Sequence, residues 1–165
     1  MPDARLRGSA EPVPRAVAWL GYGGLLPFVA LAAASVLAHL SNHPPAVWQA
    51  ALLAYGATIL SFVGALHWGF AMALRDIPAA QRTASFVWSV MPALMAWVAL
   101  LTPPQVATAL IVAGLCVHYW RDRRLAVQAG LPSWYLPMRL RLTWVACLCL
   151  LLGATVAMLH SGVAG

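Results

Sequence analysis

Long uncharged stretches alternate along this chain with short segments that contain all of its arginines. The longest such stretch, residues 46–74, contains no arginine, lysine, aspartate or glutamate. At a rise of about 1.5 Å per residue, a helix of this length exceeds the roughly 30 Å hydrocarbon core of a bilayer. The pattern therefore predicts a tilted membrane-spanning helix, and the other apolar stretches are predicted to pack around it.

Four further apolar stretches complete an all-α prediction, a polytopic membrane protein with a bundle of five transmembrane helices. The predicted helices cover residues 17–40, 46–74, 83–101, 104–120 and 142–160, which form one transmembrane domain over 17–160. Residues 1–16 are polar and proline-rich, and predict a disordered tail. Residues 121–141 contain five arginines, Gly130 and two prolines, and predict an interfacial loop on the inner surface.

Two of the predicted helices have features that bear on packing. In the first, Gly21, Gly23 and Gly24 precede Pro27, which predicts a bend whose freed backbone groups need a partner in the protein. In the second, small residues recur at short intervals, which lets neighbouring backbones approach closely. These are Gly56, Ser61, Gly64, Ala65, Gly69 and Ala73. We expect their face of the helix to lie at the centre of the bundle.

Composition and charge exclude several classes of protein. A chain of 165 residues with 62% hydrophobic and 8% charged residues, and a mean hydropathy of +0.80, is too apolar for a single water-soluble core. The net charge of +6 comes from ten arginines and four acidic residues, and no basic stripe lies on a polar scaffold, so no nucleic-acid partner is expected. The bilayer is the expected environment.

The arginines also predict an orientation. They occur in the tail, in the second loop and in the fourth loop, whereas the first loop, the third loop and the carboxyl terminus have none. Because cytoplasmic loops are enriched in basic residues, five spans place the amino terminus in the cytoplasm and the carboxyl terminus in the periplasm. The few residues before the first helix hold no evident transit peptide, so a bacterial inner membrane is expected rather than a mitochondrial one.

Two sequence runs carry a resemblance to a known family. The run from Tyr55 to Gly69, YGATILSFVGALHWG, and the run from Trp134 to Thr143, WYLPMRLRLT, resemble the transmembrane protein 69 family. The resemblance extends over most of the chain from Trp19 to Gly153. It implies a helical, multi-pass membrane protein of bacteria or mitochondria without an established activity, and so supports the fold rather than any chemistry.

His67 is the candidate functional residue inside the membrane, because an ionisable side chain at this depth is expensive and commonly functional. Trp68, Tyr55 and Ser61 are its candidate companions. One alternative is a proton-relay, quinone-binding or haem-ligating imidazole. The other is a neutral histidine that hydrogen-bonds to Tyr55, Ser61 or a serine of the third helix. For a bis-histidine haem the second ligand would be His118, which helical rise places roughly 7 Å from His67 in depth.

Other polar residues concentrate near the predicted membrane surfaces. On the inner side, the candidates for contacts with anionic lipid or within the loop are Arg121, Asp122, Arg123, Arg124, Arg139 and Arg141. Asp122 is expected to pair with Arg139 or Arg141. On the outer side, His39, His43 and His160 lie at helix ends, either as separate surface residues or as ligands of a copper or zinc ion.

No motif for catalysis is found, whether a Walker loop, a GxSxG elbow, an HExxH helix or paired intramembrane carboxylates. No catalytic residue, metal or cofactor is therefore predicted, and an enzyme is not expected. Cys116, Cys147 and Cys149 lie in apolar stretches and are expected to act as small hydrophobes. The first functional hypothesis is a non-enzymatic accessory or assembly factor that packs on a membrane partner or a second copy through the small-residue face. The alternative is a small transporter or a redox protein that uses His67.

Overall fold

The computed structural model describes residues 12–73 and 78–163, and in these ranges every regular element is an α-helix. The six helices are α1 (Arg15–Gly23), α2 (Leu26–Leu40), α3 (Ala46–Ala73), α4 (Ala79–Leu100), α5 (Pro104–Ala129) and α6 (Tyr135–Val163). This confirms the all-α prediction. Residues 1–11 of the predicted tail lie outside the described residues, and its last two residues, Arg15 and Ala16, already belong to α1.

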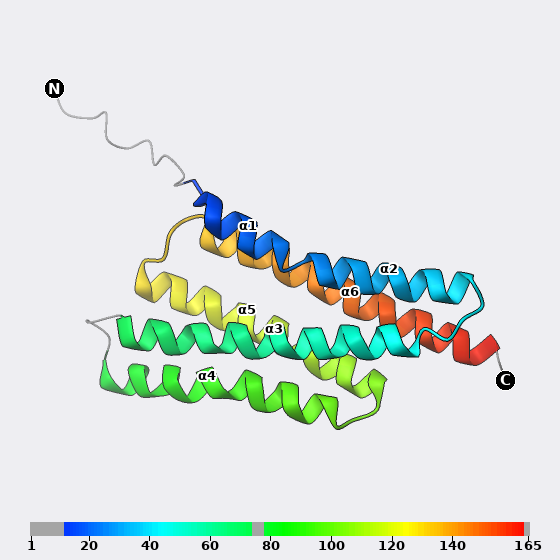
Figure 1. Ribbon diagram of the computed structural model, residues 1–165. Helices are drawn as coiled ribbons and strands as arrows, with labels where there is room; N and C mark the ends of the chain where they lie inside the picture. The colour runs from blue at the N-terminus through cyan, green and yellow to red at the C-terminus, as the bar shows by residue number, and fades with distance from the viewer. Residues whose placement is uncertain (1–11, 74–77, 164–165) are drawn as a thin grey trace.

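The helices form an elongated antiparallel bundle, with α1 and α2 together making the first pass (Figure 1). The described chain therefore begins at one end of the bundle and finishes at the other. α3 packs against α2, α4, α5 and α6, which makes it the central helix. Its buried residues recur at intervals of three and four, and they include Leu53, Gly56, Leu60, Gly64 and His67. One face of α3 therefore holds the histidine inside the bundle.

The predicted bend occurs between α1 and α2. The first helix ends at Gly23, the next begins at Leu26, and Pro27 lies in the first turn of α2, where a missing N–H costs least. The Tyr55 hydroxyl of α3 donates a hydrogen bond of 2.9 Å to the Gly24 carbonyl at this break. The expectation that the break faces protein is thereby confirmed.

The small-residue face of α3 is only partly central. A Cβ added to Gly64 would lie 2.9 Å from the Ser89 carbonyl oxygen and 2.9 Å from the Pro92 ring, so α4 approaches α3 closely here. Gly56 is similarly confined by Ile111 and Leu150. In contrast, Ala65, Gly69 and Ala73 are exposed. The prediction is therefore correct for Gly56 and Gly64 and wrong for the three exposed residues.

The predicted interfacial loop over residues 121–141 is wrong. α5 continues as a helix to Ala129 and α6 begins at Tyr135, so only a short turn separates them. Arginine, leucine, alanine and glutamine are good helix formers, and they extend α5 beyond its apolar part. Gly130, with φ +59°, ends that helix in the left-handed conformation. Pro137 falls in the first turn of α6, where backbone N–H groups have no helical partner.

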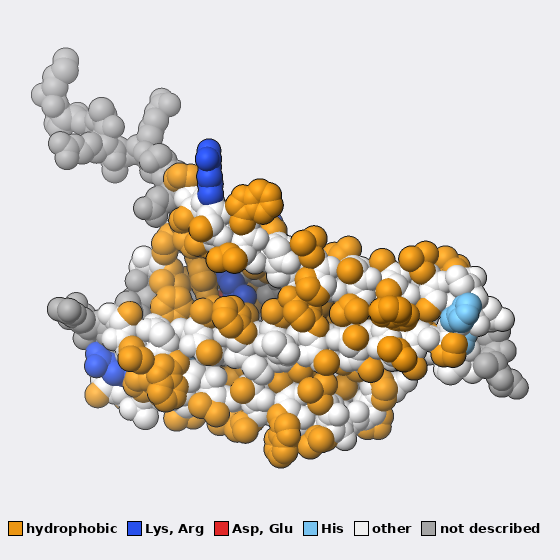
Figure 2. Space-filling model, viewed as in Figure 1, with side chains coloured by type: hydrophobic (Ala, Val, Ile, Leu, Met, Phe, Trp, Pro, Cys, Tyr) orange, Lys and Arg blue, Asp and Glu red, His pale blue; other side chains and the backbone are white. Residues whose placement is uncertain are grey.

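Four segments are long and apolar enough to cross a membrane: Arg15–Leu40, Ala46–Ala73, Ala79–Leu100 and Tyr135–Gly162. α5, with 26 residues, is long enough to cross a membrane, but it is less apolar than these four segments. The predicted count of five membrane-spanning helices is therefore not confirmed. The described arginines lie near helix ends that meet at one end of the bundle, here called the arginine end. Figure 2 shows the basic side chains toward that end, histidine at the other, and apolar side chains along the flank.

Candidate functional site

Four polar side chains from three helices meet inside the bundle near the arginine end. His118 and Asp122 lie one turn apart on the same face of α5, and both are fully buried. His67 comes from α3 and is 2% exposed, and Arg139 comes from the first turns of α6. We call His67, His118, Asp122 and Arg139 the buried cluster.

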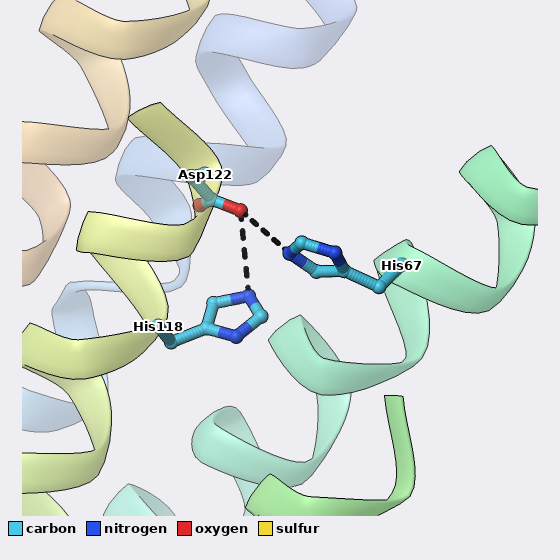
Figure 3. A group of neighbouring side chains, drawn as sticks. All are labelled: His67, His118 and Asp122. Atoms are coloured by element: carbon cyan, nitrogen blue, oxygen red, sulfur yellow. Dashed lines mark hydrogen bonds and ion pairs between the residues drawn. The ribbon is translucent and has the colours of Figure 1, made fainter. Parts of the chain in front are cut away.

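Asp122 is the centre of the buried cluster. The His67 Nε2 atom lies 3.1 Å from Asp122 Oδ1, and the His118 Nε2 atom lies 3.6 Å from the same oxygen. Both imidazole rings therefore point at one carboxylate oxygen (Figure 3). Arg139 Nε donates a hydrogen bond of 2.8 Å to the other oxygen, Oδ2. The sequence predicted that Asp122 pairs with Arg139 or Arg141, and in the structure its partner is Arg139.

Aromatic neighbours complete the cluster and fix the proton on His118. The Trp88 indole N–H of α4 donates to His118 Nδ1 at 3.4 Å. Since an indole nitrogen is only a donor, Nδ1 accepts and the ring proton lies on Nε2, toward Asp122. The two imidazole rings meet edge to face, with centroids 4.9 Å apart. The Tyr135 hydroxyl is buried beside the Asp122 and Arg139 side chains.

The charges of the buried cluster balance when both imidazoles are neutral, because one carboxylate faces one guanidinium. Removing one partner of a buried pair typically costs about 3–5 kcal/mol, since the other charge is left uncompensated. The cluster therefore joins α3, α5 and α6 by polar contacts that depend on one another. A proton added to either imidazole would give the cluster a net positive charge.

A small polar cavity adjoins the buried cluster. It has a volume of about 150 Å³ and lies where α3, α4 and α5 approach one another near the arginine end. Its lining residues are His67, Gln81, Ala84, Ser85, Arg121, Arg124 and Leu125. His67 therefore belongs both to the buried cluster and to the cavity wall, and we call this space the polar cavity.

Two kinds of bound group can be tested against these side chains. His67, His118 and Asp122 offer three ligand atoms within 4.8 Å of one another, which is a spacing that a metal ion could bridge. However, Nε2 of His118 carries its proton, and the Arg139 guanidinium already neutralises the carboxylate, so the donor set favours protons over a divalent cation. The polar cavity is also below the roughly 300–1,000 Å³ of pockets that hold drug-sized ligands, which does not fit a porphyrin.

The proposed companions of His67 lie elsewhere. Tyr55 bonds to Gly24, about 18 Å from His67 along α3, and the Ser61 hydroxyl donates to the Ala57 carbonyl of its own helix. Trp68 is 48% exposed and contacts Phe86 edge to face. None of the three forms a hydrogen bond with His67. Two of the expected partners of a neutral histidine, Tyr55 and Ser61, are engaged with backbone carbonyls instead. Of the serines expected from the third predicted helix, Ser89 donates to the Phe86 carbonyl and Ser85 lines the polar cavity with His67.

The arginines that were predicted to lie on the inner side have distinct environments. Arg121 lies over the Trp88 ring and Arg124 over the Trp120 ring, with their guanidinium carbons 4.9 and 3.6 Å from the ring centroids. Arg123 is exposed, and Arg141 is exposed with one nitrogen 3.4 Å from the Tyr22 hydroxyl. The six residues predicted as a loop surface thus lie on two helices, and only Asp122 and Arg139 enter the buried cluster.

His118 and Asp122 were named as candidates, but their contact with His67 inside the bundle was missed because the membrane boundary was set at Arg121. In the structure α5 continues past this residue, so His118 lies well inside the helix and reaches the depth of His67. Asp122 was assigned to the loop for the same reason. The signal was present in the sequence as a histidine and an aspartate four residues apart, a spacing that places both side chains on one face of a helix.

The histidines at the opposite end of the bundle meet only in part. His39 of α2 and His160 of α6 approach to 3.4 Å between their Nδ1 atoms, and both are partly exposed. His43 is exposed and joins no group of three potential ligands within the described ranges. This end of the bundle thus presents a pair of histidines, which is short of a metal-binding set of three.

Comparison with known proteins identifies the family of this chain and shows how much of its relatives' length the chain covers. The model of a family described as "Protein of unknown function (DUF3429)" matches residues 13–155. The chain belongs to this family. Transmembrane protein 69 of Xenopus tropicalis is 35% identical over 142 residues, covering 82% of this chain and 52% of the relative. The mouse protein of the same name is 28% identical over 137 residues, covering 81% of this chain and 53% of the relative.

These matches confirm the resemblance to transmembrane protein 69 and an integral membrane protein with several membrane-spanning helices. The chain spans about half the length of the curated relatives that it matches. No solved structure matches it. The family description assigns no activity, so the site has to be interpreted from its geometry.

Proposed function

We propose that this protein is a small proton-linked carrier in which His67 takes up and releases the proton. The observation that supports this is the double position of His67, which hydrogen-bonds to Asp122 and also lines the polar cavity. Ionisable side chains inside membrane bundles are costly and are found along ion and proton pathways. Histidine suits the role because its charge changes between about pH 5 and pH 8.

The groups around His67 determine what its protonation requires. The negative charge of Asp122 on α5 favours a charged His67. On the same helix, the positive charges of Arg121 and Arg124 oppose protonation of His67, and so does His118 when it is itself protonated. From α6, Arg139 neutralises Asp122 and Tyr135 contributes a phenol, while α4 presents the neutral Gln81 and Ser85. Because the carboxylate is already balanced, a proton on His67 adds an uncompensated charge. The carrier therefore gains a proton most readily together with an anion.

Charge movement in proteoliposomes tests the proposal. Purified protein is reconstituted and subjected to a pH jump on a solid-supported membrane, with His67→Gln as the variant and His43→Gln as the matched control at the opposite end. We expect a transient current in the wild type and in His43→Gln, and its loss in His67→Gln. Currents in the wild type no larger than those of protein-free liposomes, or an unchanged His67→Gln, would refute the proposal.

The accessory or assembly role predicted from the sequence remains the competing proposal. Its expected interface was the small-residue face of α3, and the two most confined residues of that face, Gly56 and Gly64, contact the chain's own helices. This favours the carrier. Copurification from native membranes in mild detergent separates the two roles, because an assembly factor should retain a partner or a second copy in constant ratio whereas a carrier need not.

For location, we propose a bacterial inner membrane with the arginine end in the cytoplasm and α5 as a fifth crossing. The distribution of the described arginines supports this, since they lie at helix ends that meet at one end of the antiparallel bundle. Fusions of a fluorescent reporter and of alkaline phosphatase to each terminus test it. A fluorescent amino terminus and an active phosphatase at the carboxyl terminus are expected, and two termini in one compartment would contradict it.

A further inference from the structure

The polar cavity carries two arginines whose charges are not matched by a described carboxylate. Asp122 is the single acidic residue within residues 12–73 and 78–163, and it is engaged by His67 and Arg139. Arg121 and Arg124 bring two positive charges to the cavity wall. Such a wall attracts an anion, and the attraction is stronger in a low-dielectric surrounding than in water.

Both guanidinium groups lie against aromatic rings. The guanidinium carbon of Arg121 lies over the Trp88 ring and that of Arg124 lies over the Trp120 ring. These cation–π contacts hold the two side chains in place and bring no acceptor oxygen to their N–H groups. The two guanidinium groups can thus present donors to the oxygen atoms of a ligand with little further loss of side-chain freedom.

The remaining lining residues add neutral polar groups and limit the size of the ligand. Ser85 contributes a buried hydroxyl and Gln81 contributes an amide. The Nδ1 atom of His67 is the ring nitrogen not directed at Asp122, and it becomes a donor only when the imidazole is protonated. Leu125 and Ala84 close the apolar part of the wall. A volume of about 150 Å³ admits one compact group rather than a large molecule.

From these observations we infer that the polar cavity binds a single anionic group, a phosphate or a carboxylate, held by Arg121 and Arg124. The anion is either free in solution or the head group of an anionic lipid, since both present the same oxygens. The inference adds a ligand to the proposed carrier. It rests on the proposed function only for the statement that the protein transports this anion together with the His67 proton. Binding itself requires only the cavity.

Binding measurements with defined probes test the inference. In one arm, the affinity for inorganic phosphate and for acetate is measured by calorimetry in nanodiscs of phosphatidylcholine. In the other, native mass spectrometry measures retention of phosphatidic acid added to those nanodiscs. The variants are Arg121→Gln and Arg124→Gln. Arg123→Gln is the matched control, because Arg123 carries the same charge on the same helix but is not part of the cavity wall.

We expect each cavity variant to lose at least about tenfold in affinity for the anion that binds, with the control unchanged, as loss of a charge-assisted hydrogen bond would give. If the cavity variants weaken binding of phosphate or acetate, the ligand is a free anion. If they weaken only the retention of phosphatidic acid, the ligand is a lipid head group. An Arg124→Lys variant that restores only part of the affinity supports recognition by the planar guanidinium.

Two outcomes would overturn the inference: equal losses in Arg123→Gln and Arg124→Gln, which indicate a general surface attraction, or no binding of any probe by the wild type. The carrier proposal fails separately, through absence of the proton current. Binding without current leaves an anion site without transport, and current without binding leaves a proton carrier whose cargo is not an anion.

Discussion

Histidines from different helices meet at both ends of the bundle, and their surroundings differ. At the arginine end, His67 and His118 share the buried Asp122, whose charge is balanced by Arg139. At the opposite end, His39 and His160 face each other without a described carboxylate or guanidinium, and they remain partly exposed. Burial of polar groups requires partners, so only the first group is enclosed.

The two ends therefore contribute differently to stability. The buried cluster links three helices through interactions that depend on one another, whereas the His39–His160 pair can turn to solvent at little cost. Between them lies the apolar centre, where close approach of α3 and α4 depends on shape rather than on charge. Substitutions should therefore have effects on stability that decrease from the arginine end to the opposite end.

The largest effect is expected for Asp122→Asn, which leaves the largely enclosed Arg139 guanidinium, 11% exposed, without its counter-charge. We expect a loss of about 3–5 kcal/mol in the free energy of unfolding. Equilibrium unfolding in mixed detergent micelles measures it, with the exposed Arg123→Gln as a control that stays within about 0.5 kcal/mol. Adding Arg139→Gln to Asp122→Asn should destabilise less than the sum of the two single changes. A stability of Asp122→Asn equal to the wild type would contradict the central role of this carboxylate.

The next effect is expected for Gly64→Ala in the apolar centre. The added Cβ would meet the Ser89 carbonyl oxygen and the Pro92 ring, and backbone cannot yield as a flexible side chain can. Overpacking of this kind typically costs about 1–3 kcal/mol. Gly69→Ala is the matched control on the same helix, because nothing lies within 4 Å of its added Cβ. Thermal unfolding of both variants in one detergent measures the difference, and equal midpoints would show that the α3–α4 contact tolerates a methyl group.

A smaller effect is expected for Tyr55→Phe, which removes the hydroxyl that donates a hydrogen bond to the Gly24 carbonyl at the break between α1 and α2. One hydrogen bond contributes about 0.5–1.5 kcal/mol net. Hydrogen exchange should increase locally at this break rather than throughout the bundle. Thr58→Ala serves as the control, since the exposed Thr58 hydroxyl bonds only within its own helix. Uniform exchange rates in Tyr55→Phe and the wild type would mean that the break needs no side-chain partner.

The smallest effect is expected at the His39–His160 pair. His160→Gln removes an interaction between partly exposed rings, so the free energy of unfolding should change by less than about 0.5 kcal/mol. The same unfolding assay as for Asp122→Asn allows direct comparison of the two ends. A loss of more than about 2 kcal/mol would show that this pair is also a structural site and that the two ends do not differ in their contribution to stability.

Particular residues show which features of the structure could be predicted from the sequence. The uncharged run from Ala46 to Ala73 predicted the central helix, and Gly24 with Pro27 predicted the break, because hydrophobicity and proline act locally. His67 was selected because it is an ionisable residue deep in an apolar helix. Its contact with Asp122 was not predicted, because the charges after Trp120 suggested a loop, while helix propensity and Gly130 determined that α5 continues to Ala129.

Hydropathy, segment length and charge along the chain are enough to predict an all-helical membrane protein with its arginines near the same ends of its helices. These properties are summed along the chain and need no knowledge of its packing. In contrast, the contact of His67 with Asp122, and the cavity that His67 shares with Arg121 and Arg124, could be found only in the folded protein. Such contacts depend on the rotation and relative depth of packed helices, and a few residues of helix beyond an expected boundary change both.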